Sequence, residues 1–417
     1  MRRRGTHGTR VHRSALPSRG PSGLARRAKS GYEMTVGGLV AAGFEPVRDA
    51  FAANFDHGDV GAACCVYANG SPVVDLVGGL ADPDADRAWT PETIALVFST
   101  TKGATAICAN RLIERGELDP DAPVAEYWPE FAQNGKAAVL VRHVLSHSAG
   151  LPVVEGEFTL DQALAWDPVV EQLARQATRW EPGTAVGYHL KTYGWLVGEL
   201  VRRITGRTIG AFFADEVAAP LGLDFWIGLP ATLEPRVARN LAPPSPTDPE
   251  LRALMDAVMA PGTLMGDALT GPSELFHYDE MWNTRALHAC ELPSSNGIGS
   301  AHAVARMYAA TVGAVDGTRL LSDASVARAT QVQSDGTDLV LGSPMRYGLG
   351  FSISPTVNLS AGRHAFGHSG AGGSLGFADP EHGIGFGYVM NRMKLGLNLD
   401  RRPANLVAAV YECVMRR

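Results

Sequence analysis

Strand-like sequence lies near both ends of this 417-residue chain, and mostly helical sequence lies between them. Residues 61–67 and 72–77 are short apolar runs joined across Asn69-Gly70, a dipeptide that supplies the two positive-φ residues of a tight hairpin turn. Near the other end, three more runs have strand-like patterns: residues 347–353, 373–377 and 384–390. Strands from both ends can pair in one sheet only if the middle of the chain forms an insertion.

The helical patterns fit the same arrangement. Apolar residues recur at helical spacing in residues 45–55, 192–205, 301–312 and 405–414. Residues 243–293, called the cover below, are rich in Pro, Met and Gly, which predicts a loop-dominated segment with short helices. The predicted fold class is α+β, with an antiparallel sheet built from the N- and C-terminal segments, helices flanking it, and an inserted, mainly helical lobe.

The change from strand-like to helical patterns and back along the chain also predicts that the chain divides into two lobes. We expect an α/β lobe of about residues 35–117 and 300–417, and a helical lobe of about residues 118–299. With 45% hydrophobic and 19% charged residues, the chain can bury a large core. Residues 34–417 should therefore form one two-lobed domain.

The first 33 residues differ from the rest in charge. Residues 1–32 contain nine Arg or Lys and no Asp or Glu, with Ser, Pro and Gly among them, and no apolar run of signal-peptide length. This composition predicts a disordered basic tail over residues 1–33. Because the net charge of the whole chain is −6, the rest is acidic, which argues against nucleic acid as the main partner. No run approaches the ~18 apolar residues of a transmembrane helix.

The cysteine content favours a reducing compartment. The five cysteines are odd in number and lack the spacing of metal sites. Most of them lie in apolar surroundings: Cys64, Cys65, Cys108, Cys290 and Cys413. They are interpreted as reduced packing residues in a cytoplasmic protein.

Ser99 and Lys102 are the first candidates for chemistry. They stand three residues apart where an apolar run becomes a helical pattern that continues to about Gly116. Residues three apart lie on one face of a helix, so the amine can reach the hydroxyl. Such a pair is a nucleophile and its base, provided that burial or a neighbouring cation lowers the pKa of the lysine. The alternative is a Ser/Thr-rich helix start followed by a solvated lysine.

Two further segments are suited to chemistry. Tyr188 follows a Gly-rich turn and precedes a helix, and a phenol can pass a proton between a lysine and a leaving oxygen. Residues 366–374 are dense in glycine where strands begin. Glycines let the backbone approach a ligand, and a free N–H there can form half of an oxyanion hole. The structural alternatives are an aromatic ring packed on the core and a Gly-rich bulge with a solvent-facing His368.

Taken in order, these three blocks resemble the serine β-lactamase and penicillin-binding superfamily. Within it, the chain is most similar to class C β-lactamases and the related family VIII carboxylesterases, over about residues 35–415. Residues 141–151 look like the family's turn after the active-site helix, and residues 373–381 look like its penultimate strand and turn. The resemblance implies a class C β-lactamase-like fold.

The resemblance also implies a role for each matching residue. Ser99 would be the acylated nucleophile, Lys102 its base, and Tyr188 the shuttle that carries the proton to and from the leaving group. The N–H groups of Ser99 and Ala371 would bind the oxyanion. The other matching residues would line the site: His368, Ser369 and Gly370. No cofactor or metal is implied, and neither His-Glu-x-x-His nor Cys-x-x-Cys occurs.

Two departures from the family pattern favour esters. Leu190, after His189, stands where lactamases and cell-wall peptidases usually carry an Asn that anchors a peptide-like substrate. His368 stands in place of a Lys whose fixed charge attracts the carboxylate of a β-lactam or peptide, and a histidine is largely neutral at pH 7. Esters need neither contact, because an alkoxide leaves more readily than an amine and an apolar acyl group is held by burial.

The sequence therefore predicts a serine hydrolase of the carboxylesterase or lipase type that cleaves small carboxylic esters through an acyl-serine intermediate. A β-lactamase or D-alanyl-D-alanine carboxypeptidase, a Ser–His–Asp hydrolase, and a non-catalytic binding protein that retains the fold are the alternatives. The oligomeric state is left open. Apolar residues of the cover are candidates for an acyl or alcohol pocket, or for plain core packing: Leu254, Met255, Met259, Leu264, Met265, Leu269, Phe276 and Trp282.

Overall fold

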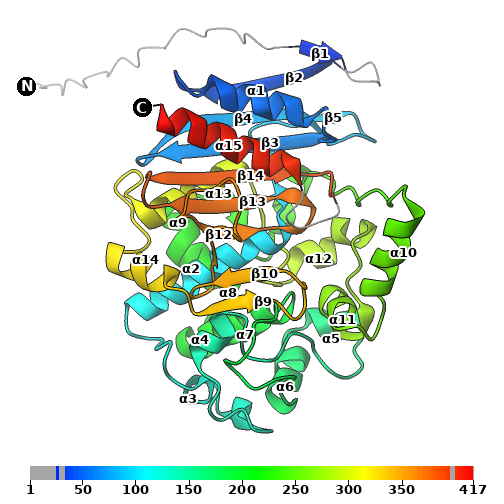
Figure 1. The fold of residues 1–417 in the computed structure, drawn as a ribbon, viewed down its shortest axis with the longest axis vertical. Helices are drawn as coiled ribbons and strands as arrows, with labels where there is room; N and C mark the ends of the chain where they lie inside the picture. Colours follow the sequence, from blue (N-terminus) through cyan, green and yellow to red (C-terminus); the bar gives the residue numbers. More distant parts are fainter. Residues whose placement is uncertain (1–24, 28–32, 395–399, 417) are drawn as a thin grey trace, which may run out of the picture.

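A large antiparallel sheet forms the centre of the molecule (Figure 1). The structure is a computed structural model, and it describes residues 25–27, 33–394 and 400–416. The strand order is β1-β2-β4-β3-β14-β13-β12-β11-β10-β9, with β5 paired to β4. Strands from the two ends of the chain meet where β3 pairs with β14. The α+β class and the antiparallel sheet predicted from the sequence are confirmed.

The strands of this sheet are β1 (Ala25–Arg27), β2 (Glu33–Val40), β3 (Gly61–Ala68), β4 (Ser71–Asp82), β5 (Arg87–Ala88), β9 (Ser334–Thr337), β10 (Pro344–Tyr347), β11 (Ser352–Ile353), β12 (Phe366–Ser369), β13 (Leu375–Asp379) and β14 (Ile384–Met390). A second, three-stranded sheet contains β6 (Ala95–Leu96), β8 (Ile298–Gly299) and β7 (Phe225–Trp226).

The helices nearest the large sheet are α1 (Glu45–Asn54), α2 (Thr101–Glu114), α13 (Ala301–Val312), α14 (Asp323–Thr330) and α15 (Arg401–Met415). The middle of the chain contains α3 (Val124–Tyr127), α4 (Val141–Leu145), α5 (Leu160–Leu164), α6 (Asp167–Arg175), α7 (Thr192–Thr205), α8 (Ile209–Phe213), α9 (Ala219–Leu221), α10 (Pro249–Val258), α11 (Leu264–Thr270) and α12 (Arg285–Ala289). Among the residues that the structure describes, none of the helices has the length and apolar character needed to cross a membrane.

The large sheet separates two hydrophobic cores. Successive side chains of a strand point to opposite faces. Cys64 therefore packs with α1 and α15 on one face, whereas Cys65 packs on the other face with α13 and the helical middle of the chain. A Cβ at Gly387 of β14 would lie 2.3 Å from the carbonyl oxygen of Ala301 in α13. Glycine at this position lets α13 lie directly against the sheet.

Most of the predicted elements agree with the structure. Helices occur at residues 45–54, 192–205 and 301–312, and Asn69 and Gly70 form the predicted positive-φ turn, with φ of 50° and 79°. The cover is, as predicted, a segment of short helices and loops.

Two predictions differ from the structure. Residues 347–353 are not one strand, because Gly348 and Gly350, the latter with φ of 92°, form a turn between β10 and β11. Within the predicted disordered tail, residues 25–27 form β1, which pairs with β2. The rest of that tail lies outside the described residues, apart from Glu33 in β2. The predicted lobe boundaries stay a prediction.

Candidate active site

Ser99 lies in a short 3₁₀ turn, η1 (Phe98–Thr100), that leads directly into α2. Phe98 has a φ of 43°, in a region that a bulky residue enters only when its surroundings hold it there. Its ring packs against those of Tyr278 and Trp282, with centroid separations of 5.3 and 5.1 Å. These contacts hold the backbone bend that places Ser99 at the start of the helix.

The turn between β12 and β13 is fixed to this bend by Ser374. Its Oγ donates a hydrogen bond to Val97 O at 2.7 Å and lies 3.0 Å from Thr100 Oγ1. A Cβ at Gly370 would lie 2.2 Å from Val97 O, so glycine is required where the two segments meet. Ser374 belongs to a Gly-x-Ser-x-Gly pattern at residues 372–376, the pattern of α/β-hydrolase nucleophiles. Its hydroxyl is buried and occupied by these contacts, so it supports the backbone instead of facing substrate.

Lys102 lies one turn into α2 from Ser99 and is fully buried. Its Nζ is 3.3 Å from Ser99 Oγ, and it donates hydrogen bonds to the carbonyl oxygens of Leu190 at 2.8 Å and Ser294 at 3.0 Å. A neutral primary amine has two N–H groups and one lone pair. With both N–H groups taken by carbonyls, the lone pair is left for the Ser99 hydroxyl.

The surroundings favour this neutral form of Lys102. Burial lowers the pKa of Lys102 well below its ordinary value, and the nearby positive charge of Lys191 lowers it further. No carboxylate is among the groups that shift it. Lys102 can therefore accept the proton of Ser99 near neutral pH, which a solvated lysine cannot do.

Tyr188 is placed between these groups and His368. The ring centroid of Tyr188 is 4.8 Å from Lys102 Nζ, and its hydroxyl is 3.4 Å from Nε2 of His368. Burial raises the pKa of Tyr188 well above its usual value, and a hydrogen bond with Ser99 partly offsets the rise. The phenol thus keeps its proton at neutral pH while it contacts the Ser99 hydroxyl.

His368 is buried and neutral. Its Nδ1 lies 2.6 Å from Ser369 O, and because a carbonyl oxygen only accepts, Nδ1 carries the proton. Nε2 is then an acceptor that faces the Tyr188 hydroxyl. Burial lowers the pKa of His368 to about 3, with the charge of Lys102 as the second cause. The histidine therefore supplies no positive charge to the site, as the sequence predicted.

The remaining predicted residues lie at the end of β12. Ser369 pairs with Leu375 of β13, Gly370 N donates to Ser374 O at 2.7 Å, and Ala371 begins the short turn η7 (Ala371–Gly373). Ala371 lines the same cavity as Ser99, whereas Ser369 and Gly370 do not line it. The structure thus brings Ser99, Lys102, Tyr188, His368 and Ala371 together.

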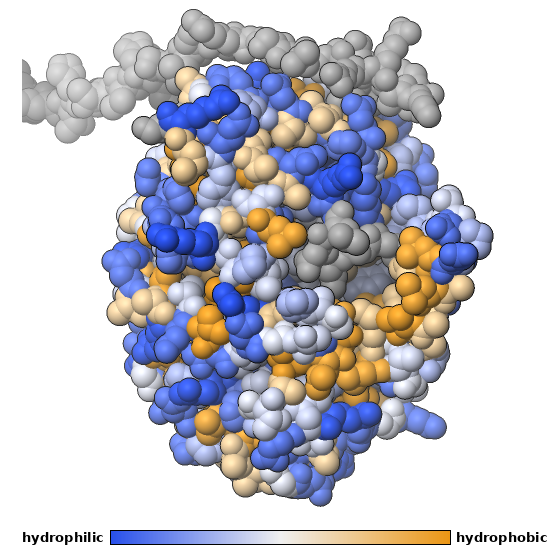
Figure 2. Space-filling view, viewed as in Figure 1, coloured by the Kyte–Doolittle hydropathy of each residue, from blue (hydrophilic) through white to orange (hydrophobic). Residues whose placement is uncertain are grey.

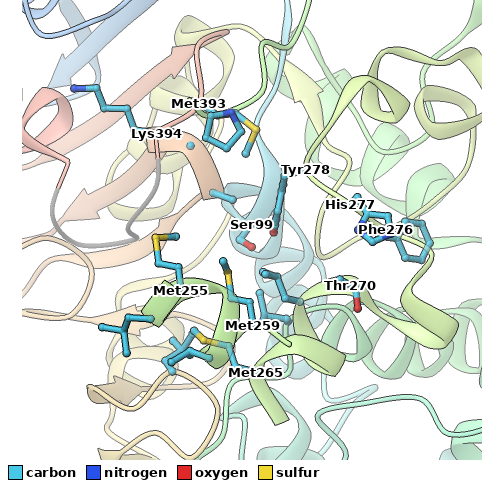
Figure 3. Close-up of a pocket in the computed structure, with 18 residues that line it drawn as sticks. Ser99, Met255, Met259, Met265, Thr270, Phe276, His277, Tyr278, Met393 and Lys394 are labelled. Carbon is cyan, nitrogen blue, oxygen red and sulfur yellow. The ribbon is translucent and has the colours of Figure 1, made fainter. Parts of the chain in front are cut away.

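Ser99 lines a cavity of about 550 Å³. Figure 3 shows Ser99 among the other side chains that line it. Six of the eight cover residues selected from the sequence line it: Leu254, Met255, Met259, Met265, Leu269 and Phe276. The other two selected residues, Leu264 and Trp282, do not line it, and Trp282 is fully buried against the ring of Phe98. Met393 and Lys394 close another side of the cavity, from the segment after β14.

The sequence interpretation missed several residues of the site. The carbonyl group of Ser294 contacts Lys102 across a separation of 192 residues, and a backbone acceptor leaves no signal in a side-chain pattern. Lys191 Nζ lies 4.9 Å from the ring centroid of Trp282 and also faces the rings of Phe276 and Tyr278. Burial lowers the pKa of Lys191 to about 7. Its position directly before the apolar helix α7 is the signal that could have drawn attention to it.

Groups of potential metal ligands lie elsewhere. In the described part of the chain, two clusters bring three such side chains together, Cys65 with Asp75 and His302, and Asp379 with Glu381 and His382. Neither cluster includes a residue that contacts Ser99 or Lys102. Within the first, His302 Nδ1 is already 2.7 Å from Asp75 Oδ2 and its Nε2 is 3.0 Å from Tyr67 Oη.

A model of one protein family covers most of the chain. The family model described as Beta-lactamase matches residues 47–410. The chain belongs to the Beta-lactamase family. Its curated relatives include Esterase/beta-lactamase LipL of Mycobacterium tuberculosis, which is 37% identical over 348 residues, covering 80% of this chain and 77% of that protein. The resemblance predicted from the ordered motifs is confirmed.

Solved structures that are similar to this chain have the same fold. A structure described as a family VIII carboxylesterase gives a TM-score of 0.82 with 38% identity, covering 91% of this chain and 99% of the other. For EstA from Arthrobacter nitroguajacolicus the TM-score is 0.81 with 34% identity, and the match covers 91% of this chain and 98% of the other. For a penicillin-binding protein homolog from Caulobacter crescentus the TM-score is 0.80 with 38% identity, and the match covers 91% of this chain and 99% of the other. Esterases and penicillin-binding proteins are therefore both among the similar proteins.

Proposed function

We propose that this member of the Beta-lactamase family is a serine carboxylesterase that cleaves small carboxylic esters through an acyl-serine intermediate. The observation that carries the proposal is the pair Ser99 and Lys102. The hydroxyl lies 3.3 Å from a buried amine whose N–H groups are held by two carbonyls. Of this pair, Ser99 lines an apolar cavity.

Acylation follows from the positions of these groups. Ser99 Oγ attacks the ester carbonyl carbon while its proton passes to Nζ of Lys102. The N–H groups of Ser99 and Ala371 stabilise the negative charge on the former carbonyl oxygen. When this intermediate collapses, the bond to the alcohol oxygen breaks, and Tyr188 donates its proton to that oxygen and recovers one from the Lys102 ammonium.

Deacylation uses the same groups in reverse. A water molecule attacks the acyl carbon, and its proton passes through Tyr188 to Lys102. The bond between the acyl carbon and Ser99 Oγ then breaks, Ser99 regains a proton from Lys102, and the carboxylic acid leaves. The 3.4 Å contact from Tyr188 to the neutral His368 supports this role, because it orients the phenol without giving it a charge to pair with.

A β-lactamase or D-alanyl peptidase activity is the second candidate, because penicillin-binding proteins and β-lactamases are also among the similar proteins. Two features favour esters. His368 is neutral where a fixed cation would attract a substrate carboxylate, and Leu190 presents an apolar side chain to the cavity. A non-catalytic protein has no need of Lys102 held beside Ser99, so that alternative is less well supported.

Intact-mass spectrometry separates these possibilities. The protein is incubated with a fluorophosphonate and, separately, with a penicillin, and Ser99→Ala serves as the control. We expect one fluorophosphonate adduct that is absent from the variant, and little or no penicillin adduct. A stoichiometric, stable penicillin adduct on Ser99 would favour the second candidate, and fluorophosphonate labelling of the variant would contradict the proposal.

Three further predictions from the sequence belong to this proposal. They are a cytoplasmic location, a small-molecule partner instead of nucleic acid, and a basic tail over residues 1–33 that takes no part in catalysis. The odd number of cysteines supports the cytoplasmic location. The net negative charge of the chain outside the tail argues against nucleic acid as the partner.

A further inference from the structure

The cavity over Ser99 is larger and more apolar than cleavage of a minimal ester requires. Its volume of about 550 Å³ is in the range of sites that enclose a whole small ligand. Its walls are mostly aliphatic and thioether side chains, and four methionines contribute: Met255, Met259, Met265 and Met393. Of the lining residues that the structure describes, Lys394 alone carries a fixed charge.

The cover supplies one wall of this cavity without forming a core of its own. Helix α10 contains no buried residue. Leu254 and Val258 of this helix line the cavity although 61% and 43% of their surfaces are exposed. Figure 2 shows apolar side chains along the edge of the molecule where α10 lies, continuing toward the hollowed middle of this face. An apolar group bound in the cavity would give this helix the packing partner that it lacks.

The position of the cavity relative to the catalytic groups indicates which half of an ester enters it. Lys102 and Tyr188, which handle the proton of the leaving alcohol, do not line the cavity, whereas Ala371 and Leu190 do. In Figure 3, Met255, Met259 and Met265 gather on one side of Ser99. Methionine side chains adapt to flexible apolar ligands, so this side suits an unbranched chain.

We infer that the cavity is an acyl-chain site, and that the protein prefers esters of medium-length, unbranched fatty acids to acetate esters. This inference rests on the proposed ester hydrolysis at Ser99. To that proposal it adds the class of acyl group that the enzyme prefers and names the cover as the wall of the cavity that determines this preference.

A chain-length series tests the inference on the full-length protein. The values of kcat/KM are measured for p-nitrophenyl acetate, butyrate, hexanoate, octanoate and decanoate below their aggregation limits. Each methylene that enters the cavity should raise kcat/KM about fourfold, mainly through a lower KM, because burial acts equally on substrate and transition state. A maximum at acetate, or a flat series, would overturn the inference while leaving the proposed ester hydrolysis intact.

Alkyl acetates of increasing alcohol length form the opposing series. We expect little dependence on the length of the alcohol. If kcat/KM rises with alcohol length and not with acyl length, the cavity holds the alcohol and the inference is wrong. If no ester is turned over in either series, the proposed function fails, and this inference fails with it.

Two tryptophan substitutions on the same helical segment provide the matched control. Met259→Trp fills the cavity and should lower kcat/KM for the octanoate at least tenfold while the acetate stays within about twofold. Leu251→Trp, at an exposed residue that does not line the cavity, should leave the whole series unchanged. Equal losses on acetate and octanoate in Met259→Trp would contradict a chain site. If that variant does not fold, Met265→Trp makes the same test from α11.

Discussion

The groups around Ser99 and helix α10 of the cover are built in opposite ways. Ser99 and His368 are only 4% and 3% exposed, Lys102 is fully buried, and hydrogen bonds with distant segments hold Lys102 and His368. In the cover, α10 has no buried residue, and Leu254 is 61% exposed. Both regions line or adjoin the same cavity.

This difference shows how one fold can separate chemistry from substrate choice. Moving a proton between Ser99 and Lys102 depends on a distance and on a lowered pKa, and both require dense packing. Selecting an apolar group requires only that apolar surface be covered, which a loosely attached segment can provide. Substitutions around Ser99 should therefore alter the rate of catalysis on every substrate. Substitutions in α10 should alter the preference among substrates.

The strongest test of the catalytic region is Ser99→Ala. The substitution removes one hydroxyl from η1, and turnover of every ester should fall by ~10³-fold or more, as in other enzymes that lose their nucleophile. The thermal unfolding temperature of the purified variant should stay close to that of the wild type. Substantial remaining activity in this variant would place the nucleophile elsewhere.

The pH dependence of catalysis tests the environment of Lys102. Because burial and Lys191 lower the pKa of Lys102 well below 10.5, the neutral amine should dominate at pH values where an exposed lysine is charged. At pH 8 an exposed lysine is neutral in roughly one molecule in 250. We expect kcat/KM for a neutral ester to reach its plateau well below pH 10.5 and to fall at lower pH, as Lys102 gains a proton.

Three histidines near Lys102 should not contribute to this profile above pH 7. Burial lowers the pKa of His189 to about 4 and of His368 to about 3, and it lowers that of His147 well below its ordinary value. The control is Lys191→Met, which removes a neighbouring cation and should move the acid limb to higher pH. A tenfold rise per pH unit that continues to pH 10 in the wild type would contradict a lowered pKa of Lys102.

Gly370→Ala tests whether the catalytic region tolerates displacement. The added Cβ would meet Val97 O at 2.2 Å, so β12 or the segment that leads to Ser99 must shift. A displacement of this kind should lower kcat by about 10²-fold. Leu251→Ala in the cover should change kcat by less than about twofold. Similar effects of the two substitutions would remove the contrast between the regions.

The substitution His368→Lys tests which substrates the catalytic region accepts. A lysine there adds a permanent charge, and a charge-assisted contact to a substrate carboxylate is worth ~1.5–3 kcal/mol. The variant should bind penicillins about ten- to a hundredfold better and gain little on neutral esters. The measurement is kcat/KM for a chromogenic cephalosporin and for p-nitrophenyl butyrate in both proteins. A wild-type preference for the cephalosporin would contradict the esterase proposal.

The smallest effect is expected at the N-terminal end. Deleting residues 1–30 removes β1, whose pairing with β2 lies at the edge of the large sheet. No residue that lines the cavity is lost, so kcat/KM should stay within about twofold. A large loss of activity in a folded truncated protein would show that this segment contributes to the site.

Local patterns predicted local structure well. The Asn69-Gly70 turn, α1 and α7 follow from positive-φ preferences and helical periodicity, which act over a few residues. The prediction failed at residues 347–353, where two glycines turn an apolar run back on itself. For Leu264 and Trp282 the sequence left pocket lining and core packing open, since an apolar pattern does not show which of two neighbouring apolar regions a residue joins.

The sequence by itself determined that Ser99 and Lys102 share one side of a helix start, because a spacing of three residues fixes that geometry locally. It also determined the order of the three motifs that connects the chain to its family. Only the tertiary structure decided that the pKa of Lys102 is lowered, because this shift depends on complete burial and on Lys191. Its carbonyl partners Leu190 and Ser294 also come from 88 and 192 residues away. Hydrogen bonds and pKa values of this kind arise where remote segments pack together, so a linear pattern cannot specify them.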